Sequence, residues 1–122
     1  MSVKRGLQAE ETWNRLVGLA TSWPATAATT SYGAPSLKVD GRMFARIRAE
    51  ADDMFVFVST PEERRAWLES GEPGLFAEPH YERFGHILAD PSATDAAILN
   101  DLLDRAWELT AREKTRAARD ET

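Results

Sequence analysis

Apolar positions recur at helical spacing in two long segments of the chain. The first runs from Leu7 to about Ser22, with its apolar stripe at Trp13, Leu16, Val17 and Ala20. The second follows a cap at Ser92 or Thr94 and continues to Ala111, with apolar residues Ile98, Leu99, Leu102, Leu103, Ala106, Trp107 and Leu109. This second stripe is too broad for a lone surface helix, so we expect it to pack on a sheet.

A third, shorter helix is marked by its capping residues. In STPEERRAWLESG, Thr60 suits the N-cap, Pro61 the first helical position, and Glu63 the closing position of a capping box. Gly71 then ends the helix. By contrast, residues 112–122 carry many charges and no apolar anchor, so we expect a charged C-terminal extension that frays.

The segments between these helices have the composition of strands. Residues 25–31, ATAATTS, suit a short edge strand, whereas residues 52–59, DDMFVFVS, are apolar on both faces and belong in the centre of a sheet. GLFAEP and FGHILAD predict two further strands, joined by PHYER. With a hairpin at residues 36–48, the predicted order is helix, four strands, helix, two strands, helix.

The hairpin SLKVDGRMFARIR depends on the length of its loop. Asp40-Gly41 lies between two alternating runs, and glycine supplies the positive φ of the turn. A three-residue loop of residues 39–41 pairs Lys38 with Arg42 and sorts the side chains by polarity. One face then holds Leu37, Met43, Ala45 and Ile47, and the other holds Lys38, Arg42, Phe44, Arg46 and Arg48. A two-residue loop pairs Lys38 with Met43 and mixes the faces, so we predict the three-residue loop.

Composition narrows the class of protein. The chain has 122 residues, 43% of them hydrophobic, which is enough for one core, and we expect residues 1–111 to form a single domain. Without cysteine there are no disulfides or thiolate sites, which fits a reducing compartment. The N-terminus has no apolar signal region, and the longest apolar run, MFVFV, is far too short to span a membrane. We therefore expect a soluble, cytoplasmic protein without a membrane partner.

Both histidines of the chain lie in EPHYERFGH, residues 78–86. His80 and His86, with oxygens from Glu78, Glu82 or Asp90, raise the question of a metal site. A zinc site needs at least three converging ligands, and this spacing has neither HExxH nor a third histidine. We favour a structural turn in which His80 hydrogen-bonds to backbone and Tyr81 packs nearby, and we predict no metal.

No pattern in the chain indicates catalysis. Serine, histidine and acidic residues occur in no recognised arrangement such as GxSxG, and SGEPG and SYGAP lack the spacing of phosphate-binding glycine loops. We therefore predict a protein that is not an enzyme, with no catalytic residues and no cofactor.

Four segments together resemble the MmcQ/YjbR family of small bacterial proteins. They are GAPSLKVDGRMFARI, PEERRAWLESG, LFAEPHYERFG and DLLDRAWELTA, and the resemblance spans residues 13–111. Position 86 departs from the family pattern, whereas Pro79, His80 and Tyr81 match one branch. The resemblance implies an α+β, two-layer sandwich with three helices mainly on one face of an antiparallel sheet of about six strands, similar in shape to secretion chaperones. It also implies no catalytic residues, and for at least one relative a DNA-binding role with wing-like hairpins has been proposed.

The formal charge of −5 works against general attraction to nucleic acid, so binding would need a local patch. The hairpin supplies one, with Lys38, Arg42, Arg46 and Arg48 to reach phosphates and Phe44 to stack on bases. The leading hypothesis is a DNA-binding or regulatory module that uses these five residues. In the competing structural interpretation, the arginines cover the sheet and pair with Glu50, Asp52 or Asp53.

A further alternative is a protein- or small-ligand-binding module, with a homodimer among its forms, that uses an exposed aromatic sheet face. Phe44, Phe55 and Phe57 decide between these hypotheses. If a helix covers the three rings, both binding hypotheses are weakened.

Overall fold

The computed structural model describes residues 2–31, 33–48, 52–79 and 85–121, with side chains described from Gln8 onward except at Ser31. Within them lie helices α1 (Ser2–Ala20), α2 (Pro61–Glu69), α4 (Ala96–Thr110) and α5 (Glu113–Asp120). The strands are β1 (Thr26–Ser31), β2 (Ala34–Val39), β3 (Arg42–Arg48), β4 (Met54–Phe57), β5 (Leu75–Phe76) and β6 (Ile87–Ala89).

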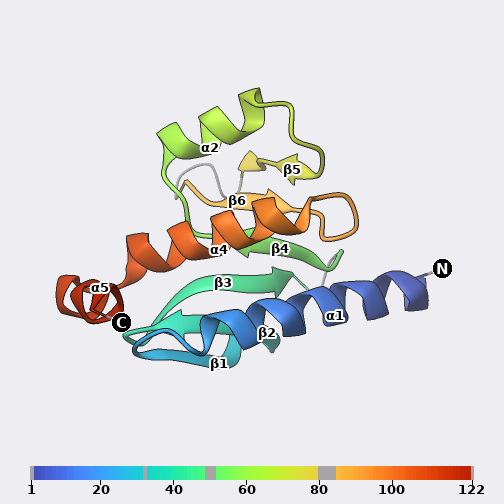
Figure 1. Cartoon of the computed structure of the whole chain (residues 1–122). Coiled ribbons are helices and arrows are strands. Elements are labelled where there is room, and N and C mark those ends of the chain that lie inside the picture. Colours follow the sequence, from blue (N-terminus) through green and yellow to red (C-terminus); the bar gives the residue numbers. More distant parts are fainter. Residues whose placement is uncertain (1, 32, 49–51, 80–84, 122) are drawn as a thin grey trace.

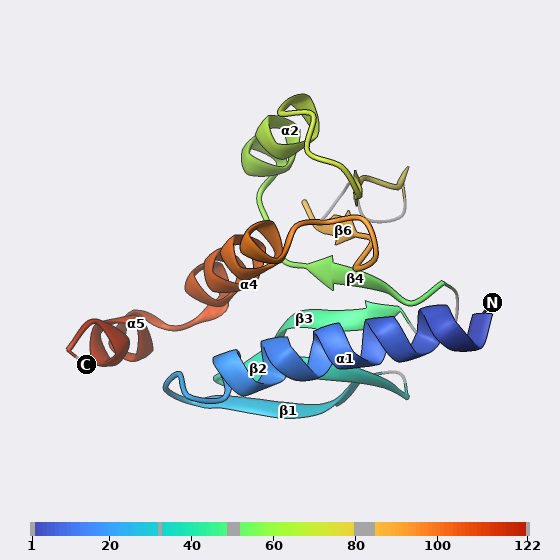
Figure 2. The same cartoon turned by 45° about the vertical axis from the view of Figure 1, so that its right-hand side comes forward.

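The strands form one antiparallel sheet in the order β1-β2-β3-β4-β6-β5. Helices α1 and α4 lie side by side on one face of this sheet, and α2 stands beside β5 at its far edge (Figures 1 and 2). The predicted α+β fold is therefore confirmed. The described part of the chain holds four helices where three were predicted, because residues after Thr110 form α5.

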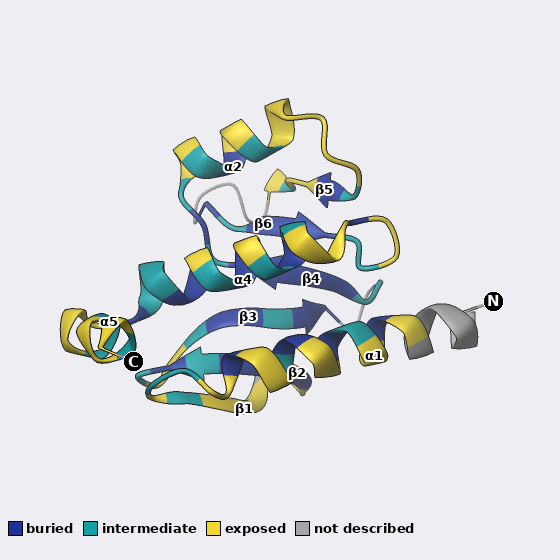
Figure 3. Cartoon of the chain, in the orientation of Figure 1, coloured by how far each residue is buried: buried dark blue, intermediate teal, exposed yellow. Residues whose placement is uncertain are grey.

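The main core lies between the sheet and the two helices. Strand β4 is buried at every position, as its two-sided apolar pattern predicted (Figure 3). Phe55 meets Trp13 of α1 edge-on, with ring centroids 5.4 Å apart, while Leu99, Leu102 and Leu103 of α4 join the same cluster. Each such side chain contributes about 1.5–3 kcal/mol by leaving water, so the core fixes α1 and α4 on this face.

Helix α2 begins at the predicted N-cap, but the Glu63 carboxylate accepts the Thr60 hydroxyl where a capping box would have it accept the Thr60 backbone N–H. Thr60 is the N-cap in an extended conformation, and its Oγ1 accepts the backbone N–H of Glu63 at 3.1 Å. The Thr60 hydroxyl in turn donates to Glu63 Oε2 at 3.2 Å, and Pro61 occupies the first turn. Glu63 Oε1 also pairs with Arg105 of α4 at 2.8 Å, so the cap joins α2 to the main helical layer.

The start of α4 differs from the prediction of Ser92 or Thr94 as the cap. The helix follows Asp95, whose side chain makes no capping hydrogen bond. Ser92 instead donates its backbone N–H and its hydroxyl to Asp90 Oδ1, at 2.9 and 2.7 Å. Thr94 is buried against Gly74. Ser92 is thus engaged in the loop before the helix, and Thr94 packs there with its backbone N–H bonded to the Asp90 carbonyl at 2.9 Å.

No helix in the described ranges has the length and apolar character that crossing a membrane requires.

Candidate nucleic-acid interface at the hairpin

The turn between β2 and β3 has two residues, which corrects the predicted three-residue loop. Asp40 has φ 52° and Gly41 has φ 79°, the pair of positive values that a type I′ turn needs. Val39 pairs with Arg42 and Lys38 pairs with Met43. Because directly opposed residues point to the same side of a sheet, Lys38 and Arg42 lie on opposite faces.

A bulge then restores the apolar pattern that a regular two-residue hairpin would break. The register shifts between Leu37 and Lys38, so that Leu37 pairs with Ala45 and Phe44 becomes the extra residue on β3. Phe44 points with Val39 into the main core and is 0% exposed. The prediction that Phe44 stacks on bases is therefore wrong, because the polarity argument assumed regular alternation along β3.

The other two phenylalanines of the sheet are covered as well. Phe55 and Phe57 are both 0% exposed, in one core cluster with residues of α1 and α4. A partner could reach these rings only by displacing a helix. Both binding hypotheses are weakened by this burial. The protein- or small-ligand-binding module has no exposed aromatic face at these residues, nucleic-acid binding keeps only its cations, and self-association stays a prediction.

Arg48 is buried and pairs with two partly exposed carboxylates. It is 8% exposed and pairs with Asp52 at 2.6 Å and with Glu78 at 2.7 Å. Its Nε donates to the second oxygen of Asp52 at 3.1 Å, and Nη2 donates to the second oxygen of Glu78 at 3.1 Å. A phosphate would have to displace two carboxylates, so Arg48 is not expected to bind nucleic acid. Its pairing with Asp52 agrees with the competing structural interpretation.

Lys38 and Arg46 lie on the distal face, which we define as the sheet face pointing away from α1 and α4. Arg46 pairs with Val56 across the strands, and both Arg46 and Lys38 are half-buried. Arg64 of α2 reaches the same side and donates to the His86 carbonyl at 3.4 Å. Burial lowers the pKa of His86, and the positive charges of Arg46 and Arg64 lower it further, so the distal face is electropositive around this imidazole.

Arg42 is exposed at the hairpin tip, where the structure adds residues that the sequence-based prediction missed. Asp40 accepts the backbone N–H of Arg112 at 2.9 Å and the hydroxyl of Thr115 at 3.0 Å. The hydrogen bond from Arg112 holds the pKa of Asp40 below its ordinary value, and the charges of Arg112 and Arg42 act in the same direction. Arg112 and Lys114 are exposed beside the turn, and we name Arg42, Arg112 and Lys114 the hairpin-tip cluster.

Helix α5 is thus attached at its first turn and again near its end. The guanidinium of Arg119 lies over the rings of Trp107 and Trp23, at 4.3 and 5.0 Å from their centroids. It also pairs with Asp104 at 2.8 Å. The basic content of REKTRAARDET was the only feature of the sequence that pointed to these contacts. The prediction looked for an apolar stripe, whereas α5 is attached through polar and cationic groups.

The stretch EPHYERFGH is described only in part. Glu78 serves the Arg48 network, and His86 is half-buried before β6. His80, Tyr81 and Glu82 lie outside the described residues, so the predicted turn at His80 stays a prediction. Among the residues that are described, no three carboxylate or imidazole side chains gather into a metal-binding group.

Gly85 shows why this stretch is structurally demanding. Its φ is +76°, and a Cβ at this position would lie 2.8 Å from the Ser59 carbonyl oxygen and 3.0 Å from Cδ of Pro61. The chain therefore passes directly over the start of α2, where only glycine fits without displacement.

Comparisons with known proteins agree with this architecture. The protein DR2400 of Deinococcus radiodurans, a crystal structure with the DUF419 family-model domain, is similar to this chain with a TM-score of 0.69 and 16% sequence identity. The match covers 88% of this chain and 84% of that one, and at this identity it supports the fold alone. The comparison with curated proteins gives no match. The YjbR family model matches residues 21–109, which confirms the resemblance seen in the sequence: the chain belongs to the YjbR family.

Proposed function

We propose that this YjbR-family chain is a non-enzymatic module that binds the phosphate backbone of nucleic acid. The contacts come from the hairpin-tip cluster, because Lys38 and Arg46 lie on the other face of the sheet from Arg42. The observation that carries the proposal is the Asp40 clamp, which holds the start of α5 against the turn at 2.9 and 3.0 Å. The charges of Arg112 and Arg42 thereby act on the same Asp40 carboxylate, and exposed Lys114 follows two residues after Arg112.

The expected binding mode is narrower than the sequence suggested. Phe44 is buried and Arg48 is engaged with carboxylates, so neither stacking on bases nor phosphate contact by all four predicted cations is expected. Phosphate contacts carry no sequence information, so binding should be independent of sequence. With a chain charge of −5, the affinity should lie at the weak end of non-specific binding, with a dissociation constant on the order of 100 μM at physiological salt.

Anisotropy titrations of labelled duplex and single-stranded DNA test the proposal. If about three phosphates are neutralised, affinity falls about fortyfold between roughly 50 and 200 mM salt. The double variant Arg42→Glu with Lys114→Glu should abolish binding at the lower salt. A matched control, Arg15→Glu with Arg65→Glu, makes the same change in net charge at α1 and α2. This control should retain most of the DNA binding.

Two results would overturn this function. One is no binding at low salt with protein at high micromolar concentration. The other is an equal loss of affinity in the two double variants, since net charge alone would then explain the binding.

A further inference from the structure

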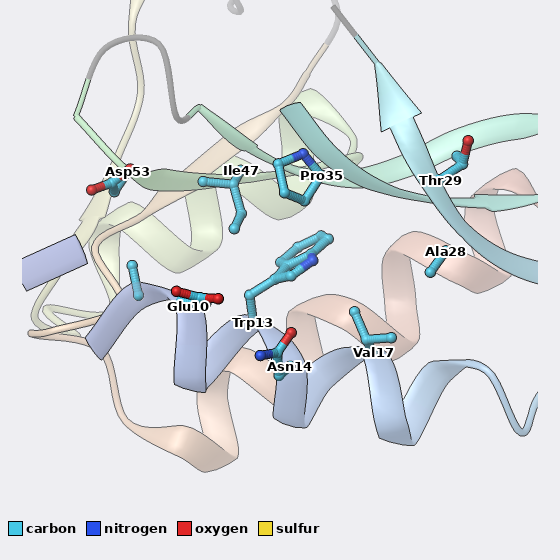
Figure 4. Close-up of a pocket in the computed structure, with 10 residues that line it drawn as sticks. Glu10, Trp13, Asn14, Val17, Ala28, Thr29, Pro35, Ile47 and Asp53 are labelled. Atoms are coloured by element: carbon cyan, nitrogen blue, oxygen red, sulfur yellow. The ribbon is translucent and has the colours of Figure 1, made fainter. Parts of the chain in front are cut away.

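A pocket lies between α1 and the strands at the end of the hairpin opposite the turn (Figure 4). It has a volume of about 400 Å³. Its apolar wall is formed by Trp13, Val17, Pro35 and Ile47. Helix α1 supplies one side of the pocket and strands β1 to β3 supply the other, so the pocket is separate from the hairpin-tip cluster.

The indole of Trp13 presents a polar atom to this pocket. Trp13 is 4% exposed, and its ring nitrogen lies on the side of the ring that faces Ala28 and Val17 (Figure 4). The comparable nitrogen of Trp107 donates to Thr26 Oγ1 at 2.7 Å, whereas Trp13 Nε1 has no acceptor anywhere in the described chain. This N–H is not among the buried polar atoms that lack a partner, so it is accessible from the pocket and can donate to an acceptor on a bound molecule.

The charged side chains of the pocket are both acidic. Glu10 of α1 and Asp53 before β4 lie beyond the same end of the Trp13 side chain (Figure 4), and no lysine or arginine lines the pocket in the described residues. Asp53 is held in place, since its φ is 60° and its backbone N–H donates to the Arg48 carbonyl at 3.1 Å. The pocket thus combines a negative end, an apolar wall and an unused donor.

We infer that this pocket binds a small organic cation with an apolar body and a hydrogen-bond acceptor. The ammonium group lies at Glu10 and Asp53, the body packs on Trp13, Pro35 and Ile47, and the acceptor takes the Trp13 Nε1–H. An anionic molecule of the same shape is excluded, because two carboxylates would face its charge. The inference is independent of nucleic-acid binding, which uses the other end of the hairpin.

Matched pairs of small molecules that differ in the sign of one charge test this inference. Tyramine and phloretate form an aromatic pair; N-acetylputrescine and N-acetyl-γ-aminobutyrate form an aliphatic pair with an amide acceptor. The readout is the Trp13 indole N–H resonance in a proton–nitrogen correlation spectrum, where the chain has only four tryptophans. The variant Trp13→Phe assigns that resonance. For ligands of about ten non-hydrogen atoms, dissociation constants on the order of 1 mM are expected.

At least one of the two cations should shift the Trp13 resonance saturably, and its anionic counterpart should bind at least about tenfold more weakly. Glu10→Gln and Asp53→Asn should each weaken the cation about threefold, as for a partly exposed ion pair. Glu11→Gln, an exposed neighbour on α1 outside the pocket, is the matched control and should leave the affinity unchanged. Asparagine tolerates the left-handed backbone at position 53, so that variant should fold.

The inference is overturned if neither cation shifts the Trp13 resonance at about 10 mM, well above the expected dissociation constant. It is also overturned if the anions bind as tightly as the cations, or if Glu11→Gln weakens binding as much as Glu10→Gln.

Discussion

Asp40 is the residue whose substitution tests the link between the hairpin and α5 most directly. Its carboxylate accepts one backbone N–H, from Arg112 at 2.9 Å, and one hydroxyl, from Thr115 at 3.0 Å. Asp40→Asn keeps the size, the tolerance for φ 52° and one acceptor oxygen, but removes the charge. Asp40→Ala removes both acceptors and places a Cβ-bearing residue without local hydrogen bonding in the left-handed region.

The two variants should differ in magnitude. A neutral acceptor makes a weaker hydrogen bond than a carboxylate, so Asp40→Asn should lower the free energy of unfolding by about 1 kcal/mol. Asp40→Ala loses two hydrogen bonds at about 1 kcal/mol each and adds backbone strain of about 1 kcal/mol, for a total of about 3 kcal/mol. Denaturant unfolding followed by circular dichroism measures both values.

The effect of Asp40→Asn should depend on pH. The folded pKa of Asp40 lies below its ordinary value of 3.8, because Arg112 and Thr115 hydrogen-bond to the ionised form. The stabilisation from the carboxylate is therefore fully present above the unfolded pKa and is lost as pH falls through the lower folded pKa. The difference between the native chain and Asp40→Asn should be constant above about pH 5 and shrink below about pH 4.

Hydrogen exchange locates the effect. Amides of α5 should exchange faster in Asp40→Ala, whereas amides of β4 should change only as much as the global stability does. Unchanged protection in α5, together with unchanged stability in both variants, would refute the conclusion that Asp40 holds this helix. Binding of DNA by Asp40→Ala should also weaken under the proposed function, because the hairpin-tip cluster would no longer be held together.

Two further predictions concern stability. Phe44→Ala should lower the free energy of unfolding by about 3–5 kcal/mol, because it empties a fully buried site. The control Met43→Ala, at the neighbouring position, should cost about 1 kcal/mol. Denaturant unfolding measures both variants, and equal small losses would place the Phe44 ring on the surface. Gly85→Ala should lower the free energy of unfolding by about 2–4 kcal/mol, because strain at φ +76° adds to a clash with backbone. The control Gly71→Ala has the same sign of φ but open space around it and should cost about 1 kcal/mol. Thermal unfolding measures both variants, and equal costs would contradict the close approach at Gly85.

The locally determined parts of the fold could be predicted well. The N-cap of α2 at Thr60 uses atoms within one helical turn, so its residues suffice to specify it. The central position of β4 follows from apolar residues on both of its faces, which only a strand between two neighbours and beneath a helical layer can bury. The four family segments were likewise readable in the chain.

The candidate site was less predictable because a single bulge changes the face of the residues around it. Polarity sorting favoured a regular hairpin with a longer loop, but Asp40 and Gly41 both adopt positive φ and Phe44 takes up the extra position. The face assigned to Arg42 and the exposure assigned to Phe44 were consequently wrong. Alternation of apolar and polar residues cannot reveal a bulge when the two-residue and the three-residue loop both bury some apolar side chains.

The sequence by itself determined three of the four described helices, the order of the strands along the chain and the central place of β4, because hydrophobic period and caps act over a few residues. Only the tertiary structure decided which cations remain accessible. Arg48 meets Glu78 thirty positions away, and Asp40 meets Arg112 seventy-two positions away. Such partners are set by the path of the whole chain. The residues next to a charged side chain in the sequence therefore reveal neither its partner nor its burial.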